Sequence, residues 1–271
     1  MIHPTAVIHP KAQLDDSIDV CPYVVIDADV VMGPGCKVGP HVYITGHTRI
    51  GANNRFYAGC VVGEAPQDLK YKEQPTELRL GDGNVIREGV TIHRSAKMGE
   101  ATVVGSNNFL MVNSHIGHNA VLGDHVILAN GALLAGHVQV ENNVFISGNC
   151  LVHQFVRVGR LSIMQGGSAI SLDLPPYTVA RGTNGICGLN IVGLRRAGMS
   201  PEDRLELKKL YHKLFRSGRN LEGLLAEARQ ESASAPARAM VDFVASAKRG
   251  VCRDVSAMRQ KIVDEDEGNI D

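Results

Sequence analysis

Residues 104–140 read VGSNNFLMVNSHIGHNAVLGDHVILANGALLAGHVQV, and every sixth residue of this stretch is aliphatic. A six-residue period matches neither the 3.6-residue turn of an α-helix nor the simple alternation of a half-buried strand. It fits a short strand followed by a tight corner, repeated so that coil stacks upon coil. The stretch therefore predicts a parallel β-helix whose core contains Val104, Leu110, Ile116, Leu122, Leu128, Leu134 and Val140.

The same register extends over most of the chain, from Ile2 to Ile170. The fifth position of each hexad is mostly small, which suits the inside of a narrow solenoid, and Cys36, Cys60 and Cys150 fall at this position. Trp is absent and aromatic residues make up 4% of the chain, so the core has to be built from small repeated side chains. We predict an all-β solenoid over residues 1–175.

Two segments interrupt the hexads, and the C-terminal part lacks them. Residues 64–79 and 97–102 are polar and keep the register on either side, so both are predicted to be loops extruded from the coil, where binding residues commonly lie. Residues 176–271 predict a small α-helical domain with an acidic tail. Its helices are expected to begin near Pro201, Asn220 and Pro236 and to end near Gly218, Glu231 and Gly250.

The composition excludes several classes of function. The 28 basic and 28 acidic residues cancel, which leaves no global field for nucleic acid or an anionic membrane. No apolar run is long enough for a membrane span, and the N-terminus lacks the pattern of a signal peptide. The six cysteines show no metal or disulfide spacing, so reduced thiols and a cytoplasmic location are expected. A positive excess in residues 175–253 suggests an acidic partner.

Stacking gathers histidines that are far apart in the sequence. Three hexads make one triangular coil of 18 residues, so Gly136 and Gln154 follow His118 in one column. Imidazoles in such a cluster either bind a divalent metal or supply a general base. No Asp or Glu lies in the column to complete a mixed metal site, which favours the base. The predicted cluster comprises His115, His118, Gly136, His137, His153 and Gln154.

Several motifs then resemble one family: APQDLKY (65–71), IREGVTIHR (86–94), NSHIGHN (113–119), LAGHV (134–138), VHQF (152–155), DLPPY (173–177) and NIVGLRRAG (190–198). They resemble the hexapeptide-repeat acyltransferases with a left-handed β-helix, and among these the UDP-N-acetylglucosamine acyltransferases that begin lipid A biosynthesis. The resemblance covers residues 1 to about 250. It implies a cytoplasmic homotrimer that transfers an (R)-3-hydroxyacyl chain from acyl carrier protein to the 3-hydroxyl of UDP-N-acetylglucosamine.

The resemblance also implies roles for matching residues. His118 is the general base, and the backbone N–H of Gly136 is the oxyanion donor. Neither a metal nor a cofactor is implied, because the acyl group arrives on the phosphopantetheine of acyl carrier protein. Met164 and Gly166 match the region that limits acyl length, with Gly166 leaving the groove open to longer chains. Substrate-binding roles are implied for Asp68, Lys70, His115, His137, His153, Gln154, Asn190 and Arg196.

Three positions depart from the family pattern. Asn119 follows the base where relatives often have Asp, so it accepts a hydrogen bond from the imidazole but brings no charge. Val192 stands where some relatives have an acid near the uracil, and Ala197 where they have a further basic residue. The contacts to the nucleotide are therefore expected to differ from those of these relatives.

Three alternatives remain open at this stage. The nearest is N-acylation of the 3-amino analogue of the same sugar nucleotide, and no residue of the sequence decides between the two acceptors. A β-helical carbonic anhydrase-like enzyme would use His93, His115 and His118 as metal ligands across a subunit interface, yet would leave the QDLKY loop and the helical domain unexplained. The third alternative is a purely structural solenoid without enzyme activity.

Overall fold

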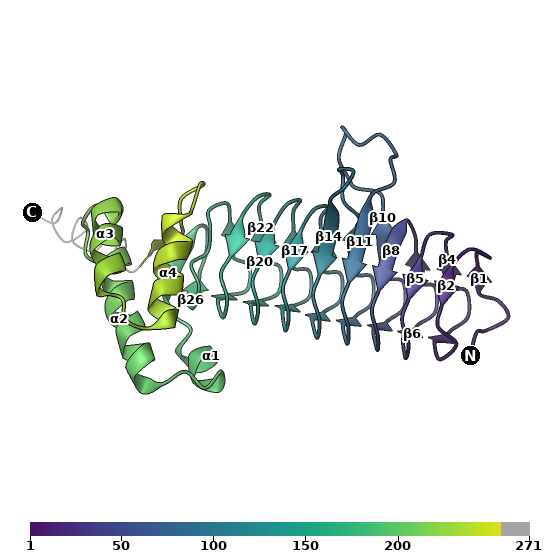
Figure 1. The fold of residues 1–271 in the computed structure, drawn as a ribbon, viewed down its shortest axis with the longest axis horizontal. Helices are drawn as coiled ribbons and strands as arrows, with labels where there is room; N and C mark the ends of the chain where they lie inside the picture. Colours follow the sequence, from purple (N-terminus) through teal and green to yellow (C-terminus); the bar gives the residue numbers. More distant parts are fainter. Residues whose placement is uncertain (256–271) are drawn as a thin grey trace, which may run out of the picture.

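The computed structural model describes residues 1–255, which wind into a long triangular prism followed by a small group of helices (Figure 1). Strand partners lie one coil apart, as in the parallel pairing of Val7 with Val25 and of His115 with Leu133. The predicted parallel β-helix and its 18-residue coil are therefore confirmed by the strand register.

Three sheets, here called A, B and C, form the walls of the prism. Sheet A contains β3 (Asp19–Val20), β6 (Lys37–Val38), β9 (Arg55–Phe56), β12 (Val85–Ile86), β15 (Phe109–Leu110), β18 (Ile127–Leu128), β21 (Phe145–Ile146), β24 (Ile163–Met164), β26 (Thr178–Ala180), β27 (Gly185–Leu189) and β28 (Arg253–Asp254). Sheet B contains β1 (Val7–Ile8), β4 (Val25–Ile26), β7 (Tyr43–Ile44), β10 (Val61–Glu64), β13 (Thr91–His93), β16 (His115–Ile116), β19 (Leu133–Leu134), β22 (Leu151–Val152) and β25 (Ala169–Ile170). Sheet C contains β2 (Gln13–Leu14), β5 (Val31–Met32), β8 (His47–Ile50), β11 (Glu77–Leu80), β14 (Ala101–Val104), β17 (Val121–Leu122), β20 (Gln139–Val140) and β23 (Arg157–Val158).

The hexad residues form the core of the prism. In each two-residue strand the second side chain points inward, because successive residues of a strand face opposite sides of the sheet. Ile116, Leu134 and Val152 are accordingly buried, and they belong to one continuous apolar cluster that follows the prism axis. The outward-facing first residues of the strands are free to vary, and they decide what each wall of the prism can bind.

Corners of four residues connect the sheets, and three of them recur in every coil. The B–C corner includes residues 117–120, 135–138 and 153–156; the C–A corner includes 105–108, 123–126 and 141–144; the A–B corner includes 111–114, 129–132, 147–150 and 165–168. The third residue of a corner adopts left-handed backbone geometry, with φ of 58° at both Asn107 and Asn119. Asn and Gly tolerate this conformation best, which explains their frequency at these positions.

Two loops leave the prism on the side of sheets B and C. Residues 65–76 connect β10 to β11 and rise well above the coils (Figure 1), and residues 94–100 connect β13 to β14. The loops brace each other: Nε2 of Gln74 donates to the carbonyl of Ala96 at 3.0 Å. Both correspond to the interruptions in the hexad pattern, although the flanking strands extend into the ends of the predicted ranges.

The C-terminal region contains α1 (Ile191–Arg196), α2 (Pro201–Phe215), α3 (Leu221–Glu231) and α4 (Ala235–Ala245). The last three are the helices predicted from their capping residues, and the side chains of Ser200, Asn220 and Ser234 do accept N–H groups of the first turns. The short helix α1 was not predicted. None of the described helices is both long and apolar enough to cross a bilayer. The predicted acidic tail lies outside the described residues from position 256 onward.

Candidate active site

A cavity of about 630 Å³ opens on the outer face of sheet B, beside the B–C corner. Leu133, Leu151 and Ala169 line it from β19, β22 and β25, and they give it an apolar wall. Its polar lining comes from β13 and β16, from the B–C corner, from the 65–76 loop and from the turn between β26 and β27. These polar residues are Gln67, His93, His115, His118, His153, Gln154, Ser171, Thr183 and Asn184.

The structure brings the predicted column together. The N–H of His137 donates to the carbonyl of His118 at 2.9 Å, and the N–H of Phe155 donates to the carbonyl of Gly136 at 3.2 Å. Gly136 lies directly against the catalytic candidate, since a Cβ atom at this position would stand 2.6 Å from Nε2 of His118. The absence of a side chain at Gly136 is therefore what leaves room for the His118 ring.

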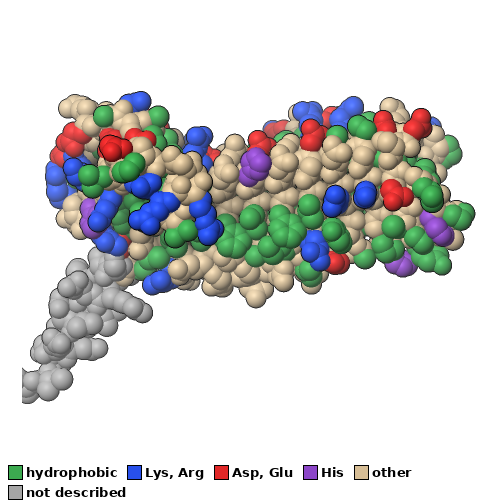
Figure 2. Space-filling model, turned by 90° about the horizontal axis from the view of Figure 1, so that it is seen from below, with side chains coloured by type: hydrophobic (Ala, Val, Ile, Leu, Met, Phe, Trp, Pro, Cys, Tyr) green, Lys and Arg blue, Asp and Glu red, His purple; other side chains and the backbone are tan. Residues whose placement is uncertain are grey.

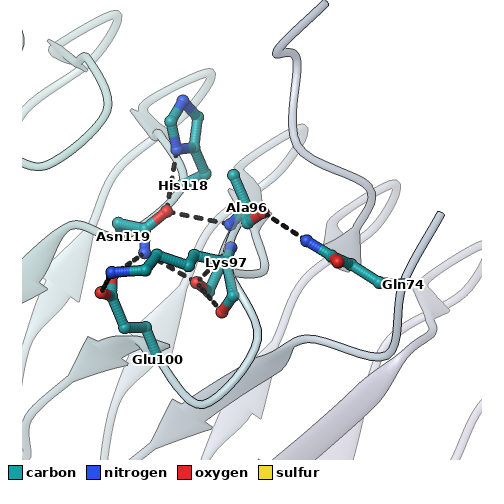
Figure 3. A network of polar contacts seen from close by, with 7 residues as sticks. Gln74, Ala96, Lys97, Glu100, His118 and Asn119 are labelled. Carbon is teal, nitrogen blue, oxygen red and sulfur yellow. Dashed lines mark hydrogen bonds and ion pairs between the residues drawn. The ribbon is translucent and has the colours of Figure 1, made fainter. Parts of the chain in front are cut away.

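The protonation pattern of the His118 ring is determined by its neighbour (Figure 3). Oδ1 of Asn119 lies 3.0 Å from Nδ1 of His118, and it also accepts the backbone N–H of Ala96 at 2.9 Å. Because a backbone N–H can only donate, the atom facing His118 is the amide oxygen, and Nδ1 of the neutral imidazole must carry the proton. Nε2 is then left unprotonated beside Gly136, as a general base requires.

A hydrogen-bond donor lies beside this base. The backbone N–H of Gly136 makes no hydrogen bond within residues 1–255, although the carbonyl of the same residue is engaged. A ligand oxygen placed next to Nε2 of His118 therefore finds an unused N–H one coil away. This pairing of a base with a free backbone donor is the arrangement that acyl transfer needs.

Three further imidazoles surround His118, and burial favours their neutral forms. Burial lowers the pKa of His93 to about 4, with His115 adding to the effect. Burial also lowers the pKa of His115, and the nearby His118 acts in the same direction. The pKa of His137, whose ring stands edge-on to His118 at 5.2 Å, is lowered chiefly by desolvation. Neutral neighbours matter because a fixed positive charge here would oppose proton uptake by His118.

Some predicted substrate-binding residues lie outside the cavity. His137 lines a second cavity of about 760 Å³ on the side of sheet C. Asp68 and Lys70 lie on the 65–76 loop, where Oδ1 of Asp68 accepts the backbone N–H of Lys70 at 2.9 Å. From this loop, it is Gln67 that reaches the first cavity.

Asn190 caps the short helix α1 and Arg196 is its last residue, and neither lines the cavity of its own chain. Asn190 is buried: its Oδ1 accepts the N–H of Gly193 at 3.0 Å, and its Nδ2 donates to the carbonyl of Leu161 at 2.8 Å. Arg196 is an exposed residue at the end of the helix. The predicted contacts of both residues with the nucleotide stay predictions.

Met164 and Gly166 are placed differently from the prediction. The side chain of Met164 is fully buried in the prism core, so it does not reach a surface groove, which corrects its assignment as a limit on acyl length. Gly166 belongs to the A–B corner, on the other edge of sheet B from His118. His118 and Gly166 do not stack, because the interval from 118 to 166 is not a multiple of the 18-residue coil. The residue three coils after His118 is Leu172.

Several lining residues were missed by sequence reasoning. Leu133 and Leu151 follow His115 at intervals of 18, so the same arithmetic that found the column would have found them. Thr183 and Asn184 lie beyond the last hexad, in the turn between β26 and β27, and carry no repeat signal.

Comparison with known family models agrees with the class of protein that the fold and the site define. A hexad-built prism with a histidine site at one corner defines a hexapeptide-repeat transferase, and a family model described as bacterial transferase hexapeptide (six repeats) matches residues 29–64 and 101–136. A second family model, described as UDP-N-acetylglucosamine O-acyltransferase, domain 2, matches residues 173–252.

Similar proteins of known sequence and structure identify the family within this class. Acyl-[acyl-carrier-protein]–UDP-N-acetylglucosamine O-acyltransferases from Syntrophobacter fumaroxidans and Halorhodospira halophila are 43% and 44% identical, and each match covers 93% of this chain and 99% of the relative. The solved UDP-N-acetylglucosamine acyltransferase of Francisella novicida is 34% identical with a TM-score of 0.90, covering 95% of this chain and 96% of that one.

The chain belongs to the UDP-N-acetylglucosamine O-acyltransferase family. The predicted fold class, a left-handed parallel β-helix followed by a small helical domain, and the predicted enzyme class, an acyltransferase, are confirmed by these matches. They favour acyl transfer over the anhydrase-like and purely structural alternatives.

Proposed function

We propose that this enzyme transfers an (R)-3-hydroxyacyl group from acyl carrier protein to the 3-hydroxyl of UDP-N-acetylglucosamine, the first step of lipid A biosynthesis. The observation that carries the proposal is the unprotonated Nε2 of His118 standing against Gly136, whose N–H is free. Relatives that match nearly the whole chain bear the name of this O-acyltransferase activity.

In the proposed mechanism, Nε2 of His118 takes the proton of the sugar hydroxyl as its oxygen attacks the thioester carbon. The carbonyl oxygen becomes an oxyanion and accepts the N–H of Gly136, a contact of a kind worth roughly 10²–10³ in rate. The tetrahedral intermediate collapses by breaking the carbon–sulfur bond. The departing phosphopantetheine thiolate then takes the proton from Nε2, which restores the neutral base. Every proton and electron pair is accounted for without a cofactor or a covalent enzyme intermediate.

The acyl chain is proposed to lie on the apolar wall formed by Leu133, Leu151 and Ala169, and to extend across sheet B towards Gly166. A Cβ atom at Gly166 would meet only the carbonyl of Gly148, at 3.6 Å, so a larger side chain fits there and would project from the corner. Each methylene that is fully buried contributes about 0.8 kcal/mol. Gly166→Met should therefore shift the preferred donor towards shorter chains, and an unchanged preference across a series of donor lengths would show that the groove does not end there.

A homotrimer is proposed because the prism exposes apolar side chains on more than one wall. Leu133 is 41% exposed and Leu151 is 49% exposed on sheet B. A second apolar row, half-buried, follows the outer face of sheet A, and Figure 2 shows hydrophobic side chains along the underside of the prism. Extended apolar surface of this kind marks an interface between proteins. A neighbouring subunit would also bring its own Asn190 and Arg196 towards a cavity that lacks them. Sedimentation analysis tests the stoichiometry.

Acyl carrier protein is the proposed acidic partner of the basic C-terminal region. Lys248 and Arg249 are exposed and line the second cavity, next to the B–C corner. Arg216 and Arg219 are less suitable contacts, because they pair with Asp254 and Glu227. Lys248→Glu should raise the KM for the donor at low salt, and the effect should fade above about 0.1 M salt, where charges are screened over about 10 Å. We propose a cytoplasmic location, with which six free cysteines are compatible.

The decisive experiment offers the purified enzyme acyl carrier protein thioesters together with UDP-N-acetylglucosamine or its 3-amino analogue. Mass spectrometry of the product should show one acyl group on the 3-oxygen of the first acceptor. Acylation of the amino analogue alone would replace the proposal by N-acyl transfer. Failure to acylate either acceptor would overturn it.

A further inference from the structure

The 94–100 loop places the carboxylate of Glu100 against Asn119, on the side of the amide away from His118. Oε2 of Glu100 accepts a hydrogen from Nδ2 of Asn119 at 2.9 Å, and the second hydrogen of Nδ2 is donated to Oγ of Ser95 at 2.7 Å (Figure 3). On its other side, the same amide contacts Nδ1 of His118 through Oδ1. A continuous chain of hydrogen bonds therefore connects the carboxylate to the base.

The chain of hydrogen bonds from Glu100 to His118 has a defined direction, because the groups at its two ends allow only one orientation of the Asn119 amide. A carboxylate accepts and cannot donate, so Glu100 requires the NH₂ group of Asn119 on its side. The backbone N–H of Ala96 requires the oxygen of the amide on the other side. The two constraints agree, and together they make Nδ1 of His118 the hydrogen-bond donor to Oδ1 of Asn119.

Charge is the second contribution of Glu100. His118 becomes an imidazolium when it takes the hydroxyl proton, and the neutral amide of Asn119 cannot by itself stabilise that charge. A hydrogen bond to a carboxylate draws positive charge to the NH₂ end of the amide and leaves its oxygen more negative, since hydrogen bonds in a chain polarise one another. The amide thus transmits part of the effect of a carboxylate to the imidazole.

We propose that Glu100 is a positioning residue that acts through Asn119, fixing the Nδ1–H form of His118 and stabilising its protonated state. The inference rests on the proposed acyl transfer with His118 as base. It assigns a function to the 94–100 loop, which otherwise only interrupts the coil.

Other charged and titratable groups moderate the effect of Glu100 on His118. Lys97 pairs with Glu100, its Nζ lying 2.6 Å from Oε1, and it holds the pKa of Glu100 below the usual value. The carboxylate therefore stays ionised near neutral pH, although the lysine offsets part of its field. The cluster also contains His93, His115 and His137, with Glu64 and Arg94 acting on His93 and Asp68 acting on His137.

Glu100→Gln is the principal test, because glutamine still accepts from Asn119 but carries no charge. We expect kcat to fall roughly threefold to tenfold and the acidic limb of the pH–rate profile to move to lower pH, since the imidazolium loses stabilisation. Lys97→Met should move the same limb in the opposite direction. Glu77→Gln is the matched control: its carboxylate forms an exposed ion pair with Arg79 and is 39% exposed, against 42% for Glu100.

Asn119→Asp, alone and combined with Glu100→Gln, gives a second test. The single variant places two carboxylates against each other, so it should be less active than wild type. The double variant should recover much of that loss, because the glutamine amide can donate to the new carboxylate, which then meets the imidazole directly. Additive effects of the two substitutions would contradict the proposed coupling.

A readout independent of turnover separates this inference from the proposed function. Titration of the His118 ring by NMR should give a lower midpoint in Glu100→Gln than in wild type, whatever the substrate. If wild type transfers acyl groups while Glu100→Gln changes neither the titration midpoint nor the pH–rate profile, the role of Glu100 is overturned and the acyltransferase proposal stands. If wild type is inactive but Glu100→Gln moves the titration midpoint, the acyltransferase proposal is overturned and the coupling of Glu100 to His118 stands.

Discussion

Two corners of the prism have the same backbone and differ in what the next coil places against them. At the C–A corner, the N–H of the second residue is capped, in several successive coils, by a side chain one coil further on. Asp82 donates to Oγ of Ser106 at 3.0 Å, Ser106 donates to Oδ1 of Asp124 at 2.7 Å, and Asp124 donates to Oδ1 of Asn142 at 3.0 Å. This corner is a ladder of satisfied donors, and it contributes stability.

The B–C corner lacks such a ladder. The equivalent N–H groups belong to His118 and Gly136, and neither is capped by a side chain of residues 1–255. Gly136, one coil after His118, has no side chain to offer, and within residues 1–255 the side chain of Gln154, one coil after Gly136, makes no hydrogen bond to the Gly136 N–H. The comparison teaches that the hexads determine the path of the backbone, while the side chain one coil further on decides whether the N–H of a corner's second residue is capped within the fold or left open to a ligand. Functional sites commonly give up local stabilisation in this way.

Gly136→Ala is expected to have the largest effect among the tests of this comparison. A methyl group would stand 2.6 Å from Nε2 of His118 and displace the ring from its place beside the free N–H. We expect kcat to fall about 100-fold, within the usual contribution of a well-placed general base, with little change in melting temperature. Gly148→Ala, at an A–B corner where the new Cβ would meet only a carbonyl at 3.3 Å, is the control that should keep its activity.

His93 should make the stability of the B–C side depend on pH. Its folded-state pKa of about 4 lies below the ordinary value of 6.5, so the unfolded chain binds more protons between these values. Stability should therefore fall as the pH is lowered from 6.5 towards 4, by about 3 kcal/mol in total. Urea unfolding at several pH values should show a weaker dependence in His93→Phe. His125→Asn, an exposed histidine of the C–A corner, should leave the dependence unchanged.

Asn84→Ala should have the smallest effect and should act on stability alone. Asn84 is fully buried at the C–A corner, and its Oδ1 accepts the N–H of Asn108 at 2.9 Å. Leaving that N–H unpaired should destabilise the fold by about 1–3 kcal/mol. The effect on kcat should be negligible. A matched surface variant, Asp82→Ala, removes only the exposed cap of the Ala52 N–H and should lose less stability. A larger loss there than at Asn84 would contradict the view that the buried hydrogen bond contributes more.

The sequence allowed the prism, its register and the column at the B–C corner to be predicted, because all three follow from periods of 6 and 18. The helices α2, α3 and α4 were also predictable from capping residues and helix-starting prolines. Helix α1 was missed because its cap, Asn190, was interpreted through the family resemblance as a substrate contact. Met164 was misplaced because the inward or outward parity of its strand was not applied.

The support behind His118 could not be predicted from the sequence. It depends on a backbone N–H, that of Ala96, which has no sequence signature, and on Glu100, which lies in a loop outside the hexad register. Asn119 was identified as a departure, but its partners became visible only when the loop was placed. Regular coils are predictable by counting, whereas loops that return to a coil are positioned by contacts that counting does not reveal.

The most direct test of the account is the kcat of His118→Ala, measured with acyl carrier protein thioester and UDP-N-acetylglucosamine and accompanied by its melting temperature. The free N–H of Gly136 and the fold should survive the substitution, whereas the base is removed. We predict a fall of roughly 10²–10⁴ in kcat, the usual contribution of a general base, at an unchanged melting temperature. A folded variant that keeps more than about a tenth of the wild-type rate would contradict the assignment of the B–C corner as the catalytic site.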